Sequence, residues 1–492
     1  MWGYAKEGSR VARGFARGIA LVVPAGAVSF ALTRVWMTLA VNLHITIGST
    51  DGAVSAMQVL VTTIMVSRFL TDAALVALAR RVASLGSHPV AAMCAAASLS
   101  FGILFATCAA NGWIPSFVLL VAGSALCGVG IELFWLLWSE LFVSMEFGKV
   151  KTVMLAKIGV DAVCALVMSP IPLDSAFMIL VLLPFLCLAG FRRAWLRRDV
   201  EGASFQAKPW RAVLLRQFAP IGIGVALLCF GFSFSQAGFQ NVLSGIDNTY
   251  ALGMQTSVLG RFLTFAVMAV ALRFAKDCHF EVLFRVSILV AAVGFLSLIL
   301  PFEGRFACFC VAVIVASFVA ENAMTLLTVY AAKHATNPPV RILACGQLAL
   351  RAGGLLGVAA GNVIALSIAA GTHEEILPYL VSLEVLLLTF AGMYFIREQS
   401  VNRFLWEVVP ANGGSADSAS RKAALLAEAF GLTQREREVL ALLLRGRSIP
   451  YIKETLYIST NTAKTHVRHI YQKVGVHERQ ELITLANAFR GA

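Results

Sequence analysis

Apolar residues dominate the first four-fifths of the chain and come in long runs separated by short polar segments. Most of these runs approach or exceed the roughly 20 residues that a helix needs to cross a bilayer. The sixth is short and the fourth is long. Together they predict an all-α, polytopic bundle of twelve membrane helices over residues 1–397, with these approximate spans: Gly18–Leu43, Ala53–Ala79, Val90–Ala110, Pro115–Phe142, Val153–Ile171, Ala176–Gly190, Val213–Phe234, Leu252–Leu272, Val282–Leu300, Phe306–Ala331, Ile342–Ala369 and Ile376–Ile396.

The pattern changes after Ile396. Residues 398–421 are polar and contain a run of small residues, which predicts a flexible cytoplasmic linker. The stretch Phe404–Val409 interrupts this linker, and we expect it to rest on the membrane surface through Trp406. Residues 422–492 then carry short amphipathic segments, which predict a small helical domain.

The first two helices of this domain have clear start signals. Thr433 and Glu436 form a capping box, in which each side chain accepts a hydrogen bond from the other's backbone amide. The helix that they start is expected to end at Gly446. Ser448 is placed to cap a second, shorter helix, where Pro450 is tolerated in the first turn.

A third helix is predicted between Ser459, as N-terminal cap, and Gly475, as a left-handed C-terminal cap. Four apolar positions share one face of it: Ala463, Val467, Ile470 and Val474. Basic and hydrogen-bonding side chains point elsewhere: Lys464, Thr465, Arg468 and Lys473. A short helix with a small apolar seam and a cationic outer face fits the major groove of DNA.

A fourth helix is predicted over Arg479–Arg490. Its apolar stripe is either part of the domain core or a dimer seam, and the sequence favours neither. The stripe consists of Leu482, Leu485, Ala486 and Phe489.

Composition narrows the class of protein. The chain is 59% hydrophobic and only 14% charged, as expected of an integral membrane protein. Its ten cysteines include no CxxC pair, so we interpret them as buried apolar side chains rather than as disulfides or metal ligands. No nucleophile with its base, metal-ligand spacing or phosphate-binding glycine loop is recognisable. We therefore expect no enzymatic activity, no cofactor and no metal.

Charge predicts the orientation of the chain. Alternate connecting segments are basic and contain, in turn, Arg80/Arg81, Lys149/Lys151, Arg192 to Arg211, Arg273/Lys276 and Lys333/Arg341. The segments between them hold acidic residues and Arg305 as their only cation. By the positive-inside rule, both termini and the C-terminal domain face the cytoplasm. From Arg421 to the end there are twelve Lys and Arg against six Glu and no Asp, so this domain is suited to bind DNA phosphates.

The apolar region also contains an internal repeat. The string RFLT starts at Arg68 in the second span and at Arg261 in the eighth, and eight residues separate its end from Arg80 and Arg273, respectively. Similar offsets pair Lys157 with Arg351, and Glu132 with Glu321. Two parallel halves, about 15–191 and 212–397, resemble the major facilitator architecture. The glycine-aspartate-arginine signature of that family is not recognisable in Asp72–Ser84.

The string from Leu432 to Ala488, LTQREREVLALLLRGRS…YIKETLYISTNTAKTHVRHIYQKVGVHERQELI…, closely resembles the LuxR/FixJ/NarL family of helix-turn-helix domains. This resemblance implies a four-helix domain that binds double-stranded DNA as a homodimer through its last helix, here Leu482, Leu485 and Phe489. It implies base contacts from Lys464, Thr465 and Arg468 and phosphate contacts near Asn461 and Thr462. Ala463 and Glu478 depart from the family's usual valine and serine.

Ionisable residues at membrane depth are costly, so they usually pair with one another or face a cavity. Structural salt bridges, Arg68 with Glu132 and Arg261 with Glu321, are the favoured interpretation. The alternative is a central, positively charged pocket for an anionic small molecule, in which Arg34 and Arg351 lack an obvious partner. The candidate cavity residues are Arg34, Arg68, Glu132, Arg261, Glu321 and Arg351.

These patterns predict a membrane-anchored transcriptional regulator whose bundle senses a small ligand. The first alternative is a secondary transporter with an appended regulatory DNA-binding domain. The second is release of the tail by proteolysis within Arg397–Ser420.

Overall fold

The computed structural model describes residues 56–488 with short gaps, and the account below covers these residues alone. The gaps are residues 79–83, 111–113, 115, 169–172, 197–211, 244–248, 275–279, 302, 336–337, 370–376, 398–399, 402–403, 405–414, 445–447 and 457. The chain divides into two compact units, Met1–Val408 and Val409–Ala492. We call them the membrane unit and the C-terminal unit. All regular elements in the described residues are helices.

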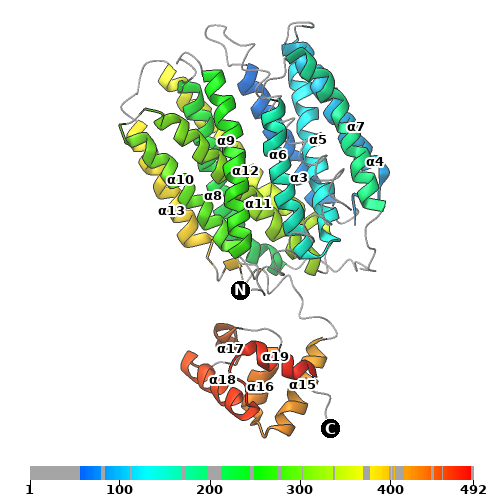
Figure 1. Ribbon diagram of the computed structural model, residues 1–492, viewed down its shortest axis with the longest axis vertical. Coiled ribbons are helices and arrows are strands. Elements are labelled where there is room, and N and C mark those ends of the chain that lie inside the picture. The colour runs from blue at the N-terminus through cyan, green and yellow to red at the C-terminus, as the bar shows by residue number, and fades with distance from the viewer. Residues whose placement is uncertain are drawn as a thin grey trace, which may run out of the picture. The chain divides into compact units, whose positions relative to one another are not determined.

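The membrane unit is a bundle of long helices (Figure 1). Each predicted span from the second to the twelfth overlaps one of them, whereas the first, Gly18–Leu43, lies outside the described residues. Eight are long and apolar enough to cross a membrane. The helices are α3 (Ala56–Leu78), α4 (Pro89–Ala110), α5 (Phe117–Val143), α6 (Phe147–Met168), α7 (Leu173–Leu196), α8 (Ala212–Leu243), α9 (Thr249–Phe274), α10 (Phe280–Ile299), α11 (Arg305–His334), α12 (Pro339–Ala369), α13 (Leu377–Phe390) and the π-helical turn η2 (Ala391–Phe395).

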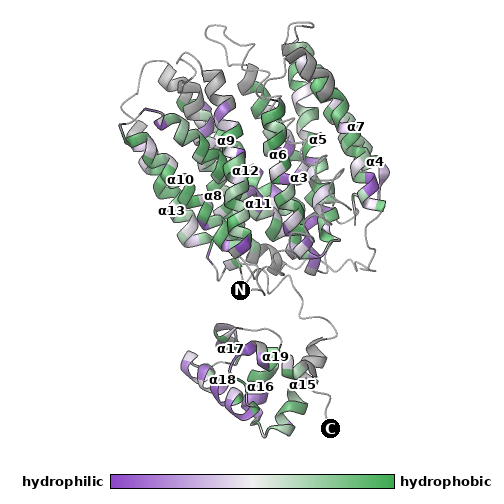
Figure 2. Cartoon of the chain, in the orientation of Figure 1, coloured by the Kyte–Doolittle hydropathy of each residue, from purple (hydrophilic) through white to green (hydrophobic). Residues whose placement is uncertain are grey.

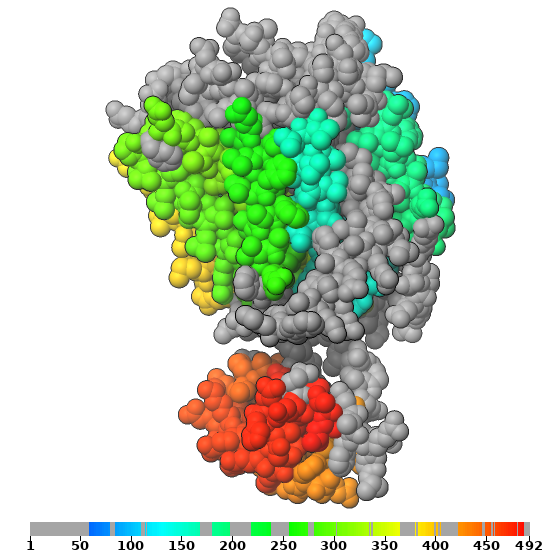
Figure 3. Space-filling model, in the orientation of Figure 1, coloured from blue at the N-terminus to red at the C-terminus, as the bar shows by residue number. Residues whose placement is uncertain are grey.

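The same helix pairs recur in the two halves of the membrane unit. In the first half, α4 and α3 pack against α5, and in the second half α10 and α9 pack against α11. Across the halves, α3 contacts α12 and α6 contacts α9. Figure 3 shows α6, in teal, beside α9, in green. This recurrence is what a parallel repeat requires.

Glycine allows the closest approach of α8 and α12. A Cβ atom at Gly353 would lie 1.9 Å from the carbonyl oxygen of Ala226, so the two backbones touch at this point. Large apolar side chains elsewhere on the bundle point outward, among them Val118, Leu289 and Leu383. Figure 2 colours most of the membrane unit as hydrophobic. In water so much exposed apolar surface would be unfavourable, but lipid tails can cover it.

The chain beyond the last membrane helix packs back onto the bundle. Val401 and Phe404 are both buried in its hydrophobic core. The ring centroid of Phe404 lies 5.2 Å from that of Phe218 on α8. At Phe404 the segment therefore contacts protein. Trp406, through which the segment is expected to rest on the membrane surface, lies outside the described residues.

The C-terminal unit has its own hydrophobic core. The predicted helices are present, and one more precedes them, starting inside the stretch predicted as a linker. The core includes Ala423 and Leu426 of this extra helix, so residues 415–421 are helical rather than coil. The helices are α15 (Ser415–Ala429), α16 (Gln434–Leu444), α17 (Ile449–Leu456), α18 (Thr460–Val474) and α19 (Arg479–Ala488).

Candidate nucleic-acid interface and buried charge cluster

Helix α18 is fixed at both ends by the residues that the sequence indicates. The Ser459 hydroxyl accepts a hydrogen bond from the Thr462 backbone amide at 3.0 Å. Gly475 ends the helix in the left-handed conformation, with φ of 75°. The four predicted apolar positions, from Ala463 to Val474, are buried. This burial fixes the rotation of α18 about its own axis.

The opposite side of α18 carries the predicted DNA-contacting residues. Lys464 and Arg468 are exposed, one turn apart, and Thr465 is half-buried beside them. Asn461 and Thr462 are exposed in the first turn, at the helix end whose dipole favours a phosphate group. In Figure 2 this helix is mostly hydrophilic.

A groove runs along the same helix. It has a volume of about 620 Å³ and is lined by Ile449 of α17, by residues of α18 and by the segment that follows it. Lys464 and Arg468 both line it, so their charges converge on one concave surface. The remaining lining residues are Val467, Tyr471, Gln472, Gly475, Val476 and His477.

Lys473 lies elsewhere and has a partner within the chain. Its Nζ donates to Glu436 Oε2 at 2.7 Å, and Glu436 also accepts from the Thr433 backbone amide at 2.8 Å, as the capping box predicts. Burial of the Glu436 carboxylate by itself would raise its pKa. Hydrogen bonds from Lys473 and Thr433 outweigh that effect, and the pKa falls to about 2. Lys473 therefore stabilises the start of α16.

Helix α19 packs into the domain core. Leu482 and Ala486 are fully buried within a single chain, and Leu485 is partly buried. Arg479 ties the start of α19 to α16 by donating to the Leu443 carbonyl at 3.3 Å. Leu482 is thus a core residue, and Leu485 remains the accessible member of the predicted dimer seam. Phe489 lies outside the described residues.

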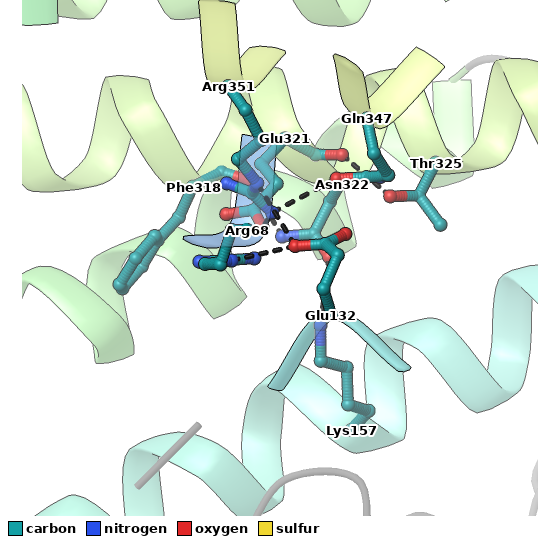
Figure 4. A network of polar contacts seen from close by, with 9 residues as sticks. All are labelled: Arg68, Glu132, Lys157, Phe318, Glu321, Asn322, Thr325, Gln347 and Arg351. Carbon is teal, nitrogen blue, oxygen red and sulfur yellow. Dashed lines mark hydrogen bonds and ion pairs between the residues drawn. The ribbon is translucent and has the colours of Figure 1, made fainter. Parts of the chain in front are cut away.

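Arg351 of α12 lies at the centre of a buried charge cluster in the membrane unit (Figure 4). It donates to Glu132 Oε2 and Glu321 Oε1, both at 3.3 Å, and to Gln347 Oε1 at 3.0 Å. Arg68 of α3 donates to Glu132 Oε2 at 2.7 Å, which confirms the predicted pair. We call Arg68, Glu132, Glu321 and Arg351 the central cluster. It links α3 and α5 of the first half to α11 and α12 of the second.

Further polar contacts join the halves, and two of them lie on α6. Arg261 Nη1 on α9 donates to Asp161 Oδ1 on α6 at 2.8 Å. Lys157 Nζ on α6 donates to Asn322 Oδ1 on α11 at 3.3 Å, and it lies 4.9 Å from the centre of the Trp135 ring. Basic side chains near the middle of the bundle thus reach from one half into the other.

The ion pairs differ from the expected ones in two respects. The expected partner of Arg261 is Glu321, but the ion pairs join Arg261 to Asp161 and Glu321 to Arg351. Arg351, expected to lack a partner, binds two carboxylates. Arg34 lies outside the described residues.

Sequence reasoning also missed Asp72, which is fully buried beside the central cluster. Its position four residues after Arg68, one turn along the same helix, is the signal that could have found it. With Asp72 included, the described part of this region contains four basic side chains and four carboxyl groups. The cations are Arg68, Lys157, Arg261 and Arg351, and the carboxylates are Asp72, Glu132, Asp161 and Glu321.

The two units are similar to different groups of known proteins. Residues 431–486 match the family described as "Bacterial regulatory proteins, luxR family". The chain is 42% identical over 74 residues to the probable transcriptional regulatory protein NarL of Mycobacterium tuberculosis (strain CDC 1551 / Oshkosh), covering 15% of this chain and 33% of that protein. It is 47% identical over 55 residues to the HTH-type transcriptional regulator MalT of Yersinia pestis (strain Pestoides F), covering 11% and 6%. The chain thus spans a third or less of the length of these relatives.

Among solved structures, the chain is similar to FucP, a Major Facilitator Superfamily transporter in the outward conformation. The TM-score is 0.50 at 14% identity, covering 77% of this chain and 97% of that one. At this identity the likeness concerns the fold alone. The C-terminal unit therefore contains a LuxR-family helix-turn-helix domain, and the membrane unit has a major-facilitator-like fold.

Proposed function

We propose that this protein is a membrane-anchored transcriptional regulator that binds double-stranded DNA through α18. The observation that carries this proposal is the LuxR-family match over residues 431–486, in which a capped α18 exposes Lys464 and Arg468. Phosphate contacts from the basic domain supply affinity, and side chains in the major groove supply base preference. No catalytic role is part of the proposal.

The finer architecture belongs to the same proposal. The membrane unit crosses the bilayer twelve times, with both termini in the cytoplasm, as the distribution of Lys and Arg among the loops favours. Helices α16 to α19 form the four-helix domain, and α15 is an addition to it. Two copies pair on DNA through the side of α19 that carries Leu485. Pairing of identical domains lets two recognition helices enter successive turns of the major groove.

The DNA claim is tested on the full-length chain in lipid nanodiscs. DNA bound from a random duplex library is sequenced after selection with wild type, Lys464→Ala and Arg468→Ala. Each substitution is expected to cost about 1–3 kcal/mol at its preferred base pair and to relax selectivity at that position. Arg437→Ala is a charge-matched control, because Arg437 is exposed on α16 rather than on α18.

The control is expected to retain the selected sequence with at most a uniform loss of affinity. If all three variants select the wild-type sequence equally well, α18 does not read bases. If wild type selects nothing and its binding vanishes with moderate salt, the domain provides only nonspecific attraction to phosphate.

We also propose that the membrane unit senses a small molecule through contacts between its two halves. A ligand can shift an equilibrium only by binding one arrangement better than another. The cluster around Arg351 supports this proposal, since it is shared by helices of both halves. The major-facilitator-like fold favours a second candidate, a secondary transporter with an appended regulatory domain.

A measurement of solute uptake distinguishes a transporter from a sensor. Membrane vesicles containing wild type or Arg351→Ala are supplied with isotopically labelled cell extract, and the solutes inside them are identified. A regulator without transport activity gives equal contents in both preparations. A solute that accumulates with wild type and not with Arg351→Ala would favour the transporter.

A further inference from the structure

Three carboxylate oxygens beside the central cluster have no hydrogen-bond donor. Both oxygens of Asp72 and Oε1 of Glu132 are buried and have no hydrogen-bond partner in the part of the chain that the structure describes. Both side chains are 0% exposed. A buried carboxylate oxygen without a donor is costly, so this group of oxygens needs an explanation.

The charged and titratable groups around Asp72 come from every described helix that packs closely on α3. Arg68 lies one turn earlier on α3, Glu132 faces it from α5, and Arg351 and Cys345 face it from α12. Glu321 of α11 pairs with Arg351, which in turn faces Asp72. Asp72 thus interacts with two guanidinium groups that are already hydrogen-bonded to other carboxylates.

Counting charges decides the state of this site. The central cluster contains two guanidinium groups, Arg68 and Arg351, and two carboxylates, Glu132 and Glu321. These four charges cancel. An ionised Asp72 would add a negative charge that no hydrogen-bond donor among the described residues stabilises, on a side chain with no exposure to water, whereas a protonated Asp72 adds none.

A proton also accounts for two of the three unpaired oxygens. The hydroxyl of a protonated Asp72 needs an acceptor, and Glu132 Oε1 is an acceptor without a donor. One proton therefore satisfies an oxygen of each residue. A proton is also small enough to bind here without a cavity.

We propose that Asp72 and Glu132 share one buried proton, held on Asp72 and donated to Glu132 Oε1. Its loss leaves two neighbouring carboxylates competing for Arg68 and Arg351. Since Arg351 is the link from α12 to Glu132 of α5, proton occupancy sets how firmly the two halves are joined. The site thus makes the proton a ligand of the membrane unit, whether that unit regulates transcription or transports a solute.

Infrared spectroscopy of the full-length protein in lipid tests the assignment. A protonated, buried carboxyl group gives a C=O stretching band that is distinct from those of carboxylates and shifts when O–H is exchanged for O–D. The wild-type spectrum is compared with those of Asp72→Asn and of Glu146→Gln, which removes an exposed carboxylate. Wild type and Glu146→Gln are expected to show the band, and Asp72→Asn to have lost it.

Wild-type protein labelled with carboxyl-¹³C aspartate makes the test independent of variant folding. The label is expected to move the band to lower frequency, and Glu132→Gln to shift it, because the hydroxyl loses a charged acceptor. The proposal is overturned if the frequency of the C=O band does not change with the aspartate label, or if the band persists in folded Asp72→Asn. A wild-type minus Asp72→Asn difference spectrum that contains only carboxylate bands also overturns it.

Discussion

Glu436 joins three parts of the C-terminal unit through one carboxylate. It accepts hydrogen bonds from Thr433 before α16 and from Lys473 on α18, while its own backbone lies in the first turn of α16. Glu436→Gln removes the charge that both donors use, and we expect it to lower the free energy of unfolding by about 1.5–3 kcal/mol. Thermal melts of the unit Val409–Ala492, which has its own core, measure this loss.

The matched control is Glu438→Gln. Glu438 pairs with Arg435 on the surface of the same helix, and a pair of this kind contributes about 0–1 kcal/mol. Equal losses from the two substitutions would mean that the contact with Lys473 stabilises nothing beyond an ordinary surface pair.

The same contact predicts a pH dependence. The pKa of Glu436 is lowered from its ordinary 4.5 to about 2, because hydrogen bonds from Lys473 and Thr433 outweigh the effect of burial. A lowered pKa stabilises the folded state above the unfolded-state pKa, and this contribution is lost as the pH falls from 4.5 towards 2. Wild type should therefore lose more stability than Glu436→Gln over that interval, as acid titrations of both proteins would reveal.

Sequence reasoning succeeded at this scale where a residue's role depends on its own helix. The period of 3.6 residues correctly assigned Ala463 and Ile470 to the buried face of α18, and the caps Ser459 and Gly475 followed from local backbone needs. It could not supply a partner that lies on a neighbouring element. Lys473 has the spacing of a DNA contact, and its partner within the chain, Glu436, lies 37 residues earlier on another helix.

Among the elements, every predicted apolar run from the second to the twelfth overlaps a helix, and eight of the described helices are long and apolar enough to cross a membrane. The exception lies at the boundary of the C-terminal unit. Small polar residues around Ser415 suggested coil, yet α15 forms there because Ala423 and Leu426 share a face that packs into the core. Burial of these residues in the core outweighed the weak local preference for coil. A short stretch of sequence carries no information about such burial.

Helix α8 also anchors the segment that leaves the membrane unit. Phe404 is 1% exposed and packs against Phe218. Phe404→Ala should cost up to about 3–5 kcal/mol of packing at this contact. We expect the backbone amides of Ser400 and Val401, which donate to the Arg397 carbonyl, to exchange hydrogen faster, measured by mass spectrometry on the full-length protein.

Phe218→Ala should give the same result, since it removes the other ring. Phe390→Ala serves as the control, because Phe390 is an exposed residue on α13. Unchanged exchange in both Phe404→Ala and Phe218→Ala would show that the segment is held by something other than this aromatic contact.

At the scale of the whole membrane unit, the repeat explains part of the polar network and fails to explain the rest. Lys157 and Arg351 occupy equivalent spans, and each reaches into the opposite half, to Asn322 and Glu132 respectively. Arg68 and Arg261 are also equivalent, yet Arg68 pairs within its half and Arg261 across to Asp161. Equivalent positions in the two halves can have different partners, so the repeat predicts where charges lie better than what they bind.

The ion pair Arg261–Asp161 allows a direct test of whether polar contacts between the two halves stabilise the membrane unit. Both side chains are buried and joined at 2.8 Å, so removing one takes the opposite charge away from the other in a low-dielectric interior. Arg261→Leu and Asp161→Leu should each destabilise the full-length protein by about 3–5 kcal/mol, whereas the double substitution should recover much of that loss. Thermal unfolding in one detergent measures the stability of all four proteins.

Because the pair bridges α9 and α6, each single variant should also raise the yield of a cysteine-specific label at positions along that interface. Additive losses in the double variant would mean that the two charges act independently, and that packing of helices rather than the ion pair holds the halves together.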